Sequence, residues 1–98
     1  MRLFGTVYKV TFHENQIDVD PNHDETMYGC MSRTEKYIRL WRPKGMHAAE
    51  LLKTYLHEVL HAVDFDLGGE VTDEKVIDKL SIGLCSWVQE NGIKVRIG

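Results

Sequence analysis

Strand patterns in the first half of the chain and helix patterns in the second half predict an α+β domain. We expect a small antiparallel sheet of about three strands, packed against two helices. Residues 1–45 contain β-branched and aromatic residues that alternate with polar ones, which is typical of strands. Residues 47–67 and 73–90 carry apolar residues at the spacing of amphipathic helices. At 98 residues, the chain is expected to form one domain over 1–98.

The expected strands lie on both sides of a long loop. The first is 3–12, in which apolar and polar residues alternate. Residues 13–26 are acidic and contain Asn, Asp and Pro, so they predict an exposed loop. The segments 27–32 and 36–41 flank a short polar piece, and this predicts a hairpin.

The helix ends are marked by their residue types. Gly68 and Gly69 are a strong stop for the first helix. Thr72 is a suitable N-cap for the second, with Asp73 and Glu74 near the positive end of the helix dipole. Asn91 and Gly92 end this helix, and residues 93–98 are either a short strand or an unpaired end.

Each helix divides into two faces at about 100° per residue. One face of the first helix is apolar and should pack on the sheet; its members are Leu52, Tyr55, Leu56, Val59 and Val63. The other face carries His57, His61 and Asp64, with Glu58 rotated away from that stripe. The second helix has an apolar arc expected to pack on the first helix and the sheet, made of Val76, Ile77, Leu80, Leu84, Trp87 and Val88.

Composition excludes several classes of function. The formal net charge is −3 and no basic run occurs, which argues against nucleic acid as a partner. No apolar run is long enough for a membrane span or a signal peptide. Cys30 and Cys85 are far apart and predict thiols in a reducing cytoplasm, although a single disulfide is the alternative.

The pattern His57-Glu58-x-x-His61 predicts a metal site. Two histidines four residues apart project from adjacent turns of one helix face, so they can share one ion. Zinc binds neutral imidazole nitrogens at about 2.0–2.1 Å, and a catalytic zinc takes three protein ligands with one position left open. The alternative is two unrelated surface histidines.

The third ligand is expected on the second helix. Glu74 is the first choice, and Asp78, one turn later, would accept a hydrogen bond from a ligating histidine. The reverse assignment, with Asp78 as the ligand, stays open, as does an ordinary solvated acidic face. Asp64 either supports a histidine in the same way or is a helix-end charge.

Other candidates are weaker. Cys85 is nearly three turns from Glu74, and a buried position is expected for it. His13, His23 and His47 have no partner at a ligand spacing, so loop or cap positions are expected. Tyr28 or His23 would be the auxiliary catalytic group if one exists.

The segments 54–64 and 72–84, "TYLHEVLHAVD" and "TDEKVIDKLSIGL", resemble zincin metallopeptidases, in particular small phage and bacterial ImmA/IrrE-like and SprT-like domains. The resemblance implies a glutamate ligand on the second helix, a polar residue four positions later that supports a histidine, and a phage or bacterial cytoplasmic origin. ImmA-like relatives carry an Ala-Asn pair after the ligand Glu. Here Ser81-Ile82 follows Asp78, and this alignment favours Asp78 over Glu74.

The predicted function is a zinc-dependent peptidase. Zinc-activated water would attack the peptide bond, with Glu58 as the general base. An extended substrate would bind along 28–32, where Gly29 would let its backbone approach closely. So small a domain leaves little room for side-chain pockets, so a protein partner would supply specificity. The alternatives are a zinc-containing regulatory or protein-binding module with little peptidase activity, and a metal-free interaction domain.

Overall fold

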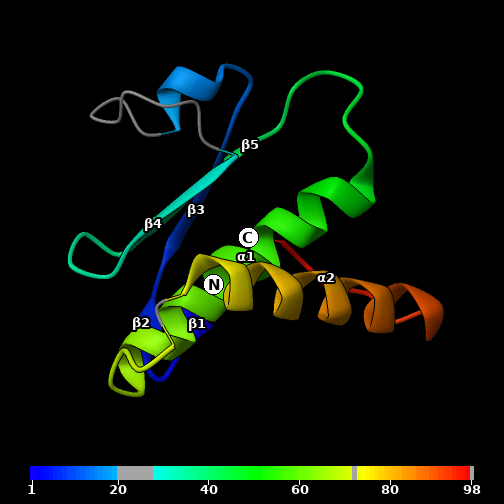
Figure 1. Cartoon of the computed structure of the whole chain (residues 1–98). Helices are drawn as coiled ribbons and strands as arrows, with labels where there is room; N and C mark the ends of the chain where they lie inside the picture. The colour runs from blue at the N-terminus through cyan, green and yellow to red at the C-terminus, as the bar shows by residue number, and fades with distance from the viewer. Residues whose placement is uncertain (20–27, 72, 98) are drawn as a thin grey trace.

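The computed structural model describes residues 1–19, 28–71 and 73–97. It confirms an α+β fold, in which small sheets pack against two helices (Figure 1). Both helices lie within one residue of their predicted bounds. The elements in chain order are β1 Arg2–Leu3, β2 Thr6–Val7, β3 Lys9–His13, the 3-10 helix η1 Gln16–Asp18, β4 Gly29–Ser32, β5 Tyr37–Trp41, α1 Ala48–Asp66 and α2 Glu74–Glu90.

The main sheet is mixed, which corrects the antiparallel sheet expected from the sequence. Its strand order is β3-β5-β4, with β4 antiparallel to β5 and β3 parallel to β5. The β4–β5 turn is short and permits only an antiparallel pair, as predicted. A long connection joins β3 to β4, and these two strands are not neighbours in the sheet. Strand β5 lies between them and runs parallel to β3. The alternation of apolar and polar residues identifies which side chains of a strand point inward, but it does not identify the strand with which it pairs.

The single first strand expected from the sequence is interrupted. β1 and β2 form a tight antiparallel hairpin in which Leu3 pairs with Thr6. Its two central residues, Phe4 and Gly5, have φ values of 48° and 78°. Such a two-residue turn needs positive φ at both central positions. Phenylalanine seldom occupies such a position, so the residue types at 4 and 5 do not predict this turn.

The core lies between the sheet and α1. It contains Tyr8 and Tyr55 together with Ile38, Leu40 and Ala62, all at most 5% exposed. Of the face of α1 predicted to be apolar, Tyr55 is buried and Val59 is partly buried against this cluster. The residues buried with Tyr55 are Thr54, Glu58 and Ala62, so the buried face is rotated toward Glu58.

Helix α2 packs against α1 through a face different from the one predicted. Its buried residues are Ile77, Ser81, Cys85 and Val88. Two of them are small, which lets the two helix backbones approach closely. The rest of the predicted apolar arc is solvent-exposed, namely Val76, Leu80, Leu84 and Trp87. The distribution of apolar residues along α2 therefore did not predict which of its residues pack against α1.

The helix caps position the loop between α1 and α2. Gly68 and Gly69, both at positive φ, end α1 as predicted. The N-cap of α2 is Asp73, whose side chain accepts a hydrogen bond from the Lys75 N–H at 2.8 Å. The predicted cap Thr72 and the predicted loop residues 20–26 lie outside the described residues. Residues 93–97 are not in a strand, and Ile97 packs against the core.

An ion pair joins the β4–β5 turn to the end of α1. The Arg33 guanidinium donates to Asp66 Oδ1, and the Asp66 side chain is only 7% exposed. Asp66 Oδ2 is buried and has no hydrogen-bond partner among the described residues, so Arg33 supplies the cation that offsets the burial of this carboxylate.

Replacing Arg33 by alanine should lower the free energy of unfolding by about 1–3 kcal/mol, because it leaves Asp66 buried without a counter-charge. Urea unfolding would measure this loss. In an Asp66→Asn background the same Arg33→Ala change should cost much less. Equal losses in both backgrounds would show that the ion pair does not stabilise the fold.

Candidate metal centre

Helix α1 brings two imidazole rings together. His57 and His61 are four residues apart and therefore lie one above the other on the same face. Their ring centroids are 4.8 Å apart, and the two Nε2 atoms are separated by 3.1 Å. Each side chain is about one-fifth exposed, so the pair is partly shielded but open to solvent.

Glu74 reaches this pair from the first turn of α2. Its Oε2 lies 2.9 Å from His57 Nε2, and its Oε1 lies 2.8 Å from His61 Nε2. One ligand atom from each of the three residues lies within 4.8 Å of the others. The short loop and the Asp73 cap set the start of α2, and this start places the carboxylate over both rings. The three residues form a candidate metal-binding group.

The spacing of the nitrogens fits a tetrahedral ion. Two nitrogens bound to one zinc at about 2.0–2.1 Å lie about 3.3–3.4 Å apart in tetrahedral geometry. The separation between the two Nε2 atoms, 3.1 Å, is close to this value. Glu74 is 71% exposed, so its side chain has room to move outward by the few tenths of an ångström that an ion needs. The donor set of two imidazoles and one carboxylate suits zinc.

Asp78 approaches the opposite side of His57. Its Oδ1 lies 3.5 Å from His57 Nδ1, whereas Glu74 contacts Nε2. A carboxylate at Nδ1 favours the tautomer that leaves Nε2 with a free lone pair. Glu74 therefore belongs to the group that converges on the two Nε2 atoms, whereas Asp78 lies near the Nδ1 atom of His57, on the other side of the ring.

Asp64 has a different partner. Its Oδ1 accepts a hydrogen bond from the Val71 N–H at 2.8 Å. This bond ties the end of α1 to the loop that leads into α2. Asp64 therefore shapes the path of the chain toward Glu74, and no described contact joins it to either histidine.

Glu58 lies on the inner side of α1 and is only 7% exposed. Burial raises the pKa of its carboxyl from 4.5 to about 8, with a smaller contribution from the negative charge of Glu74. An acid with this pKa holds its proton at neutral pH. The sequence placed Glu58 beside the histidine stripe, but did not predict that the sheet would cover it.

Gly29 lies beside this carboxyl, although the sequence predicts that it faces the backbone of a substrate. It lies at the start of β4, and its Cα hydrogens face Thr54 and Glu58 on α1. Gly29 pairs with Leu40 and Met31 pairs with Ile38, and both partners are buried in the core. Alternation along β4 from these inward residues could have predicted the direction in which Gly29 faces.

The remaining candidates lie away from the three converging side chains. His13 Nε2 bonds the Thr11 hydroxyl at 2.8 Å, and His47 is the N-cap of α1. Tyr28 packs against Trp41, with ring centroids 5.2 Å apart. His23 is outside the described residues.

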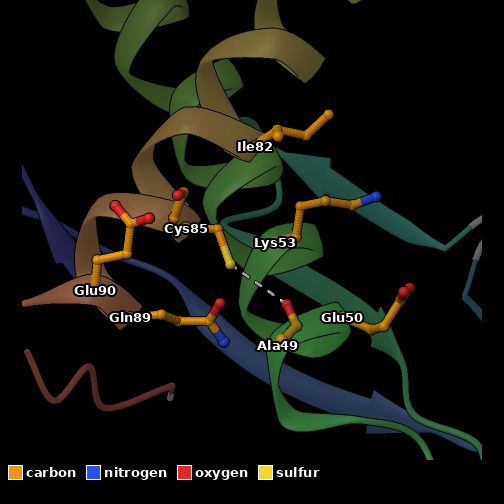
Figure 2. Close-up of a pocket in the computed structure, with 8 residues that line it drawn as sticks. Ala49, Glu50, Lys53, Ile82, Cys85, Gln89 and Glu90 are labelled. Atoms are coloured by element: carbon orange, nitrogen blue, oxygen red, sulfur yellow. Dashed lines mark hydrogen bonds between the residues drawn. The ribbon is translucent and has the colours of Figure 1, made fainter. Parts of the chain in front are cut away.

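Cys85 lines a cavity at the other end of the helix pair. No disulfide joins it to Cys30. It is buried, as expected, and its thiol donates to the Ala49 carbonyl at 3.6 Å (Figure 2). The cavity, about 370 Å³, lies between the first turns of α1 and the last turns of α2, with Lys53 and Glu90 also on its wall. None of the three candidate metal ligands lines it.

Comparisons with known proteins give no assignment: no family model, curated protein or solved structure matches this chain. Among the described residues, no helix is both long enough and apolar enough to cross a membrane.

The raised pKa of Glu58 predicts a pH-dependent stability of the metal-free protein. Between about pH 4.5 and 8, folding takes up a proton at Glu58, so the free energy of unfolding falls as the pH rises. The slope from this group is at most about 1.4 kcal/mol per pH unit. Glu58→Gln removes the titration, so its stability relative to the wild type should increase from pH 5 to pH 8. Denaturant unfolding with a chelator present would test this, and a pH-independent difference would contradict it.

Asp78→Asn should weaken zinc binding by roughly 10-fold or more, because it weakens the acceptor at His57 Nδ1. Calorimetric titration would measure the change. Asp64→Asn is the matched control: it removes the same charge, while its amide oxygen can still accept from the Val71 N–H and keep the loop to Glu74 in place, so it should change the affinity less than about 3-fold. Similar losses in the two variants would indicate a general electrostatic effect instead of a specific contact.

Proposed function

We propose that this protein is a zinc-dependent peptidase of the zincin type, with His57, His61 and Glu74 as the metal ligands and Glu58 as the general base. The observation that carries the proposal is the position of Glu58. A buried carboxyl follows directly after the first histidine of a converging His–His–Glu group. A site that only bound a metal for structural reasons would not need this buried acid, and the burial is energetically unfavourable.

Bound zinc would supply a Lewis acid that activates water and polarises the scissile carbonyl. The role of Glu58 is proton transfer. Its carboxylate accepts a proton from the attacking water and passes it to the leaving amine. Burial raises the pKa of Glu58 and makes it a stronger base than an exposed glutamate, and a cation held by His57, His61 and Glu74 would lower this pKa. Asp78, whose Oδ1 lies 3.5 Å from His57 Nδ1, would favour the orientation and tautomer of the His57 ring that a ligand needs.

The proposed substrate is an extended polypeptide that binds along β4. Among the described strands, β4 pairs only with β5, so it is an edge strand on the side of α1. Main-chain hydrogen bonds to an edge strand hold a peptide without deep side-chain pockets. The cavity beside Cys85 lies away from β4, and a protein partner is proposed to supply specificity.

The location that fits this activity is the cytoplasm of a bacterial or phage-infected cell. Two widely separated cysteines without a disulfide agree with a reducing compartment. The chain carries a net charge of −3, so neither nucleic acid nor a membrane surface is proposed as a partner.

The second candidate function is a zinc-containing regulatory or protein-binding module with little peptidase activity. It is favoured by the same carboxyl, which is protonated at neutral pH in the absence of metal. If zinc does not lower this pKa enough, Glu58 cannot act as a base, and the group would only bind the ion.

The proposal predicts chelator-sensitive cleavage of an unfolded protein substrate. Zinc should restore the activity, and Glu58→Gln should bind one zinc per chain but lose at least about 100-fold in kcat, because it has no base. Mass spectrometry of the products and metal analysis of the variant would measure both. The matched control is Glu50→Gln, a change of the same kind two turns earlier on α1, which should retain activity.

The outcomes separate the candidates. Stoichiometric zinc without cleavage by the wild type would favour the regulatory module. Cleavage by metal-loaded Glu58→Gln at the wild-type rate would contradict the role of Glu58. If the wild type binds no zinc, and a His61→Ala variant shows the same lack of zinc binding, the metal centre itself is excluded.

A further inference from the structure

Strand β4 and helix α1 lie in close contact at Gly29. A Cβ atom added to Gly29 would lie 2.9 Å from Thr54 Cγ2, 3.1 Å from Glu58 Cγ and 3.2 Å from Glu58 Oε1. Each of the other glycines in the described residues has open space at the same position. Gly29 is not among the glycines with positive φ. The structure therefore requires a glycine here for lack of space and not for backbone conformation.

The strand cannot easily move away from the helix. Gly29 pairs with Leu40, which is fully buried in the core. The residue before it, Tyr28, accepts a hydrogen bond from the Trp41 N–H at 2.8 Å. Any retreat of β4 at this point would disturb both the pairing with β5 and the core beneath it.

Thr54 cannot easily move either. It is a β-branched residue in the middle of α1, where such side chains have few allowed χ1 rotamers. Its hydroxyl donates to the Glu50 carbonyl at 3.0 Å, which fixes the position of the methyl group. The Glu58 side chain is then the group with the freedom to move, because its carboxyl ends a flexible chain.

We propose that Gly29 is a positioning residue for Glu58: its missing side chain forms the niche in which the Glu58 carboxyl is held between β4 and α1. The sequence interpretation assigned this glycine to the approach of a substrate backbone. In the structure the missing Cβ faces inward, toward α1, so the glycine serves the carboxyl instead. The placement of Glu58 stands on geometry alone, whereas its effect on catalysis rests on the proposed function.

The proposal predicts that a methyl group at position 29 displaces the Glu58 carboxyl and leaves the metal ligands in place. In Gly29→Ala, zinc affinity should stay within about 3-fold of the wild type, because the three atoms nearest to the added Cβ belong to Thr54 and Glu58 and none belongs to His57, His61 or Glu74. The kcat should fall by up to about 100-fold, which is the loss associated with a shift of about 1 Å in a reacting group, since the contacts at 3.1 and 3.2 Å require Glu58 to move by at least a few tenths of an ångström. KM should change little, since the outer edge of β4 keeps its backbone groups.

The decisive experiment separates packing from positioning. The variants are Gly29→Ala, Thr54→Ser and the double variant. Serine lacks Cγ2 but keeps the hydroxyl, so the double variant relieves the 2.9 Å contact and retains the two contacts with Glu58. The thermal midpoint should therefore return toward that of Thr54→Ser, while Glu58 stays displaced. Gly83→Ala is the matched control, because Gly83 on α2 has nothing within 4 Å of its added Cβ.

The position of Glu58 can be read without any catalytic assay. Metal-free protein is treated with a water-soluble carbodiimide and an amine, and the labelled fraction of Glu58 is measured by peptide mass spectrometry. We expect low labelling in the wild type, Thr54→Ser and Gly83→Ala, and high labelling in Gly29→Ala and in the double variant. The kcat should be low in the same two proteins.

Three results would overturn the proposal. The first is labelling of Glu58 in Gly29→Ala that does not exceed the wild type. The second is a double variant that recovers low labelling together with its thermal midpoint. The third is a wild type in which Glu58 is already labelled. If no protein in the set cleaves peptides, the peptidase function fails, and the labelling still decides the role of Gly29. If the wild type is active and labelling does not change, the positioning role alone fails.

Discussion

The packing of α1 on the inner face of the sheet is the constraint on which the rest of the structure depends. Tyr55 and Ala62 bury themselves against Ile38 and Leu40, and this contact fixes the rotation of the helix about its axis. Once that rotation is set, Glu58 must lie inside, and His57 and His61 must lie on the side that faces α2. This one contact thus places the acid and the two imidazoles on neighbouring faces of α1, although the acid and the first histidine are adjacent in sequence.

The burial of the Glu58 carboxyl lowers the free energy of unfolding, whereas the hydrophobic packing of α1 raises it. A carboxyl with a pKa of about 8 is held in an environment that disfavours its charged form, and Glu74 adds a second negative group nearby. A cation bound by His57, His61 and Glu74 would relieve both effects. Metal binding at this group would therefore be coupled to the charge state of Glu58 and to the stability of the fold.

Three residues outside the centre determine how it is assembled. Asp64 ties the loop after α1 through Val71, Asp73 caps α2, and together they direct Glu74 to the histidines. On the opposite side, Gly29 allows β4 to cover Glu58. These contacts show how a chain of 98 residues can build a protected acid and an open metal group on neighbouring faces of one helix.

The sequence by itself determined the α+β class, both helices, the β4–β5 hairpin and the stripe of His57 and His61, because these follow from local periodicity and end residues. Only the tertiary structure decided the parallel pairing of β3 with β5, the burial of Ser81 and Cys85 in place of Leu80 and Trp87, and the inward direction of Gly29. It also brought Glu74 to the Nε2 atoms and Asp78 to Nδ1. The reason is physical: these features depend on which surfaces meet across the fold, and periodicity along one segment carries no information about its partner.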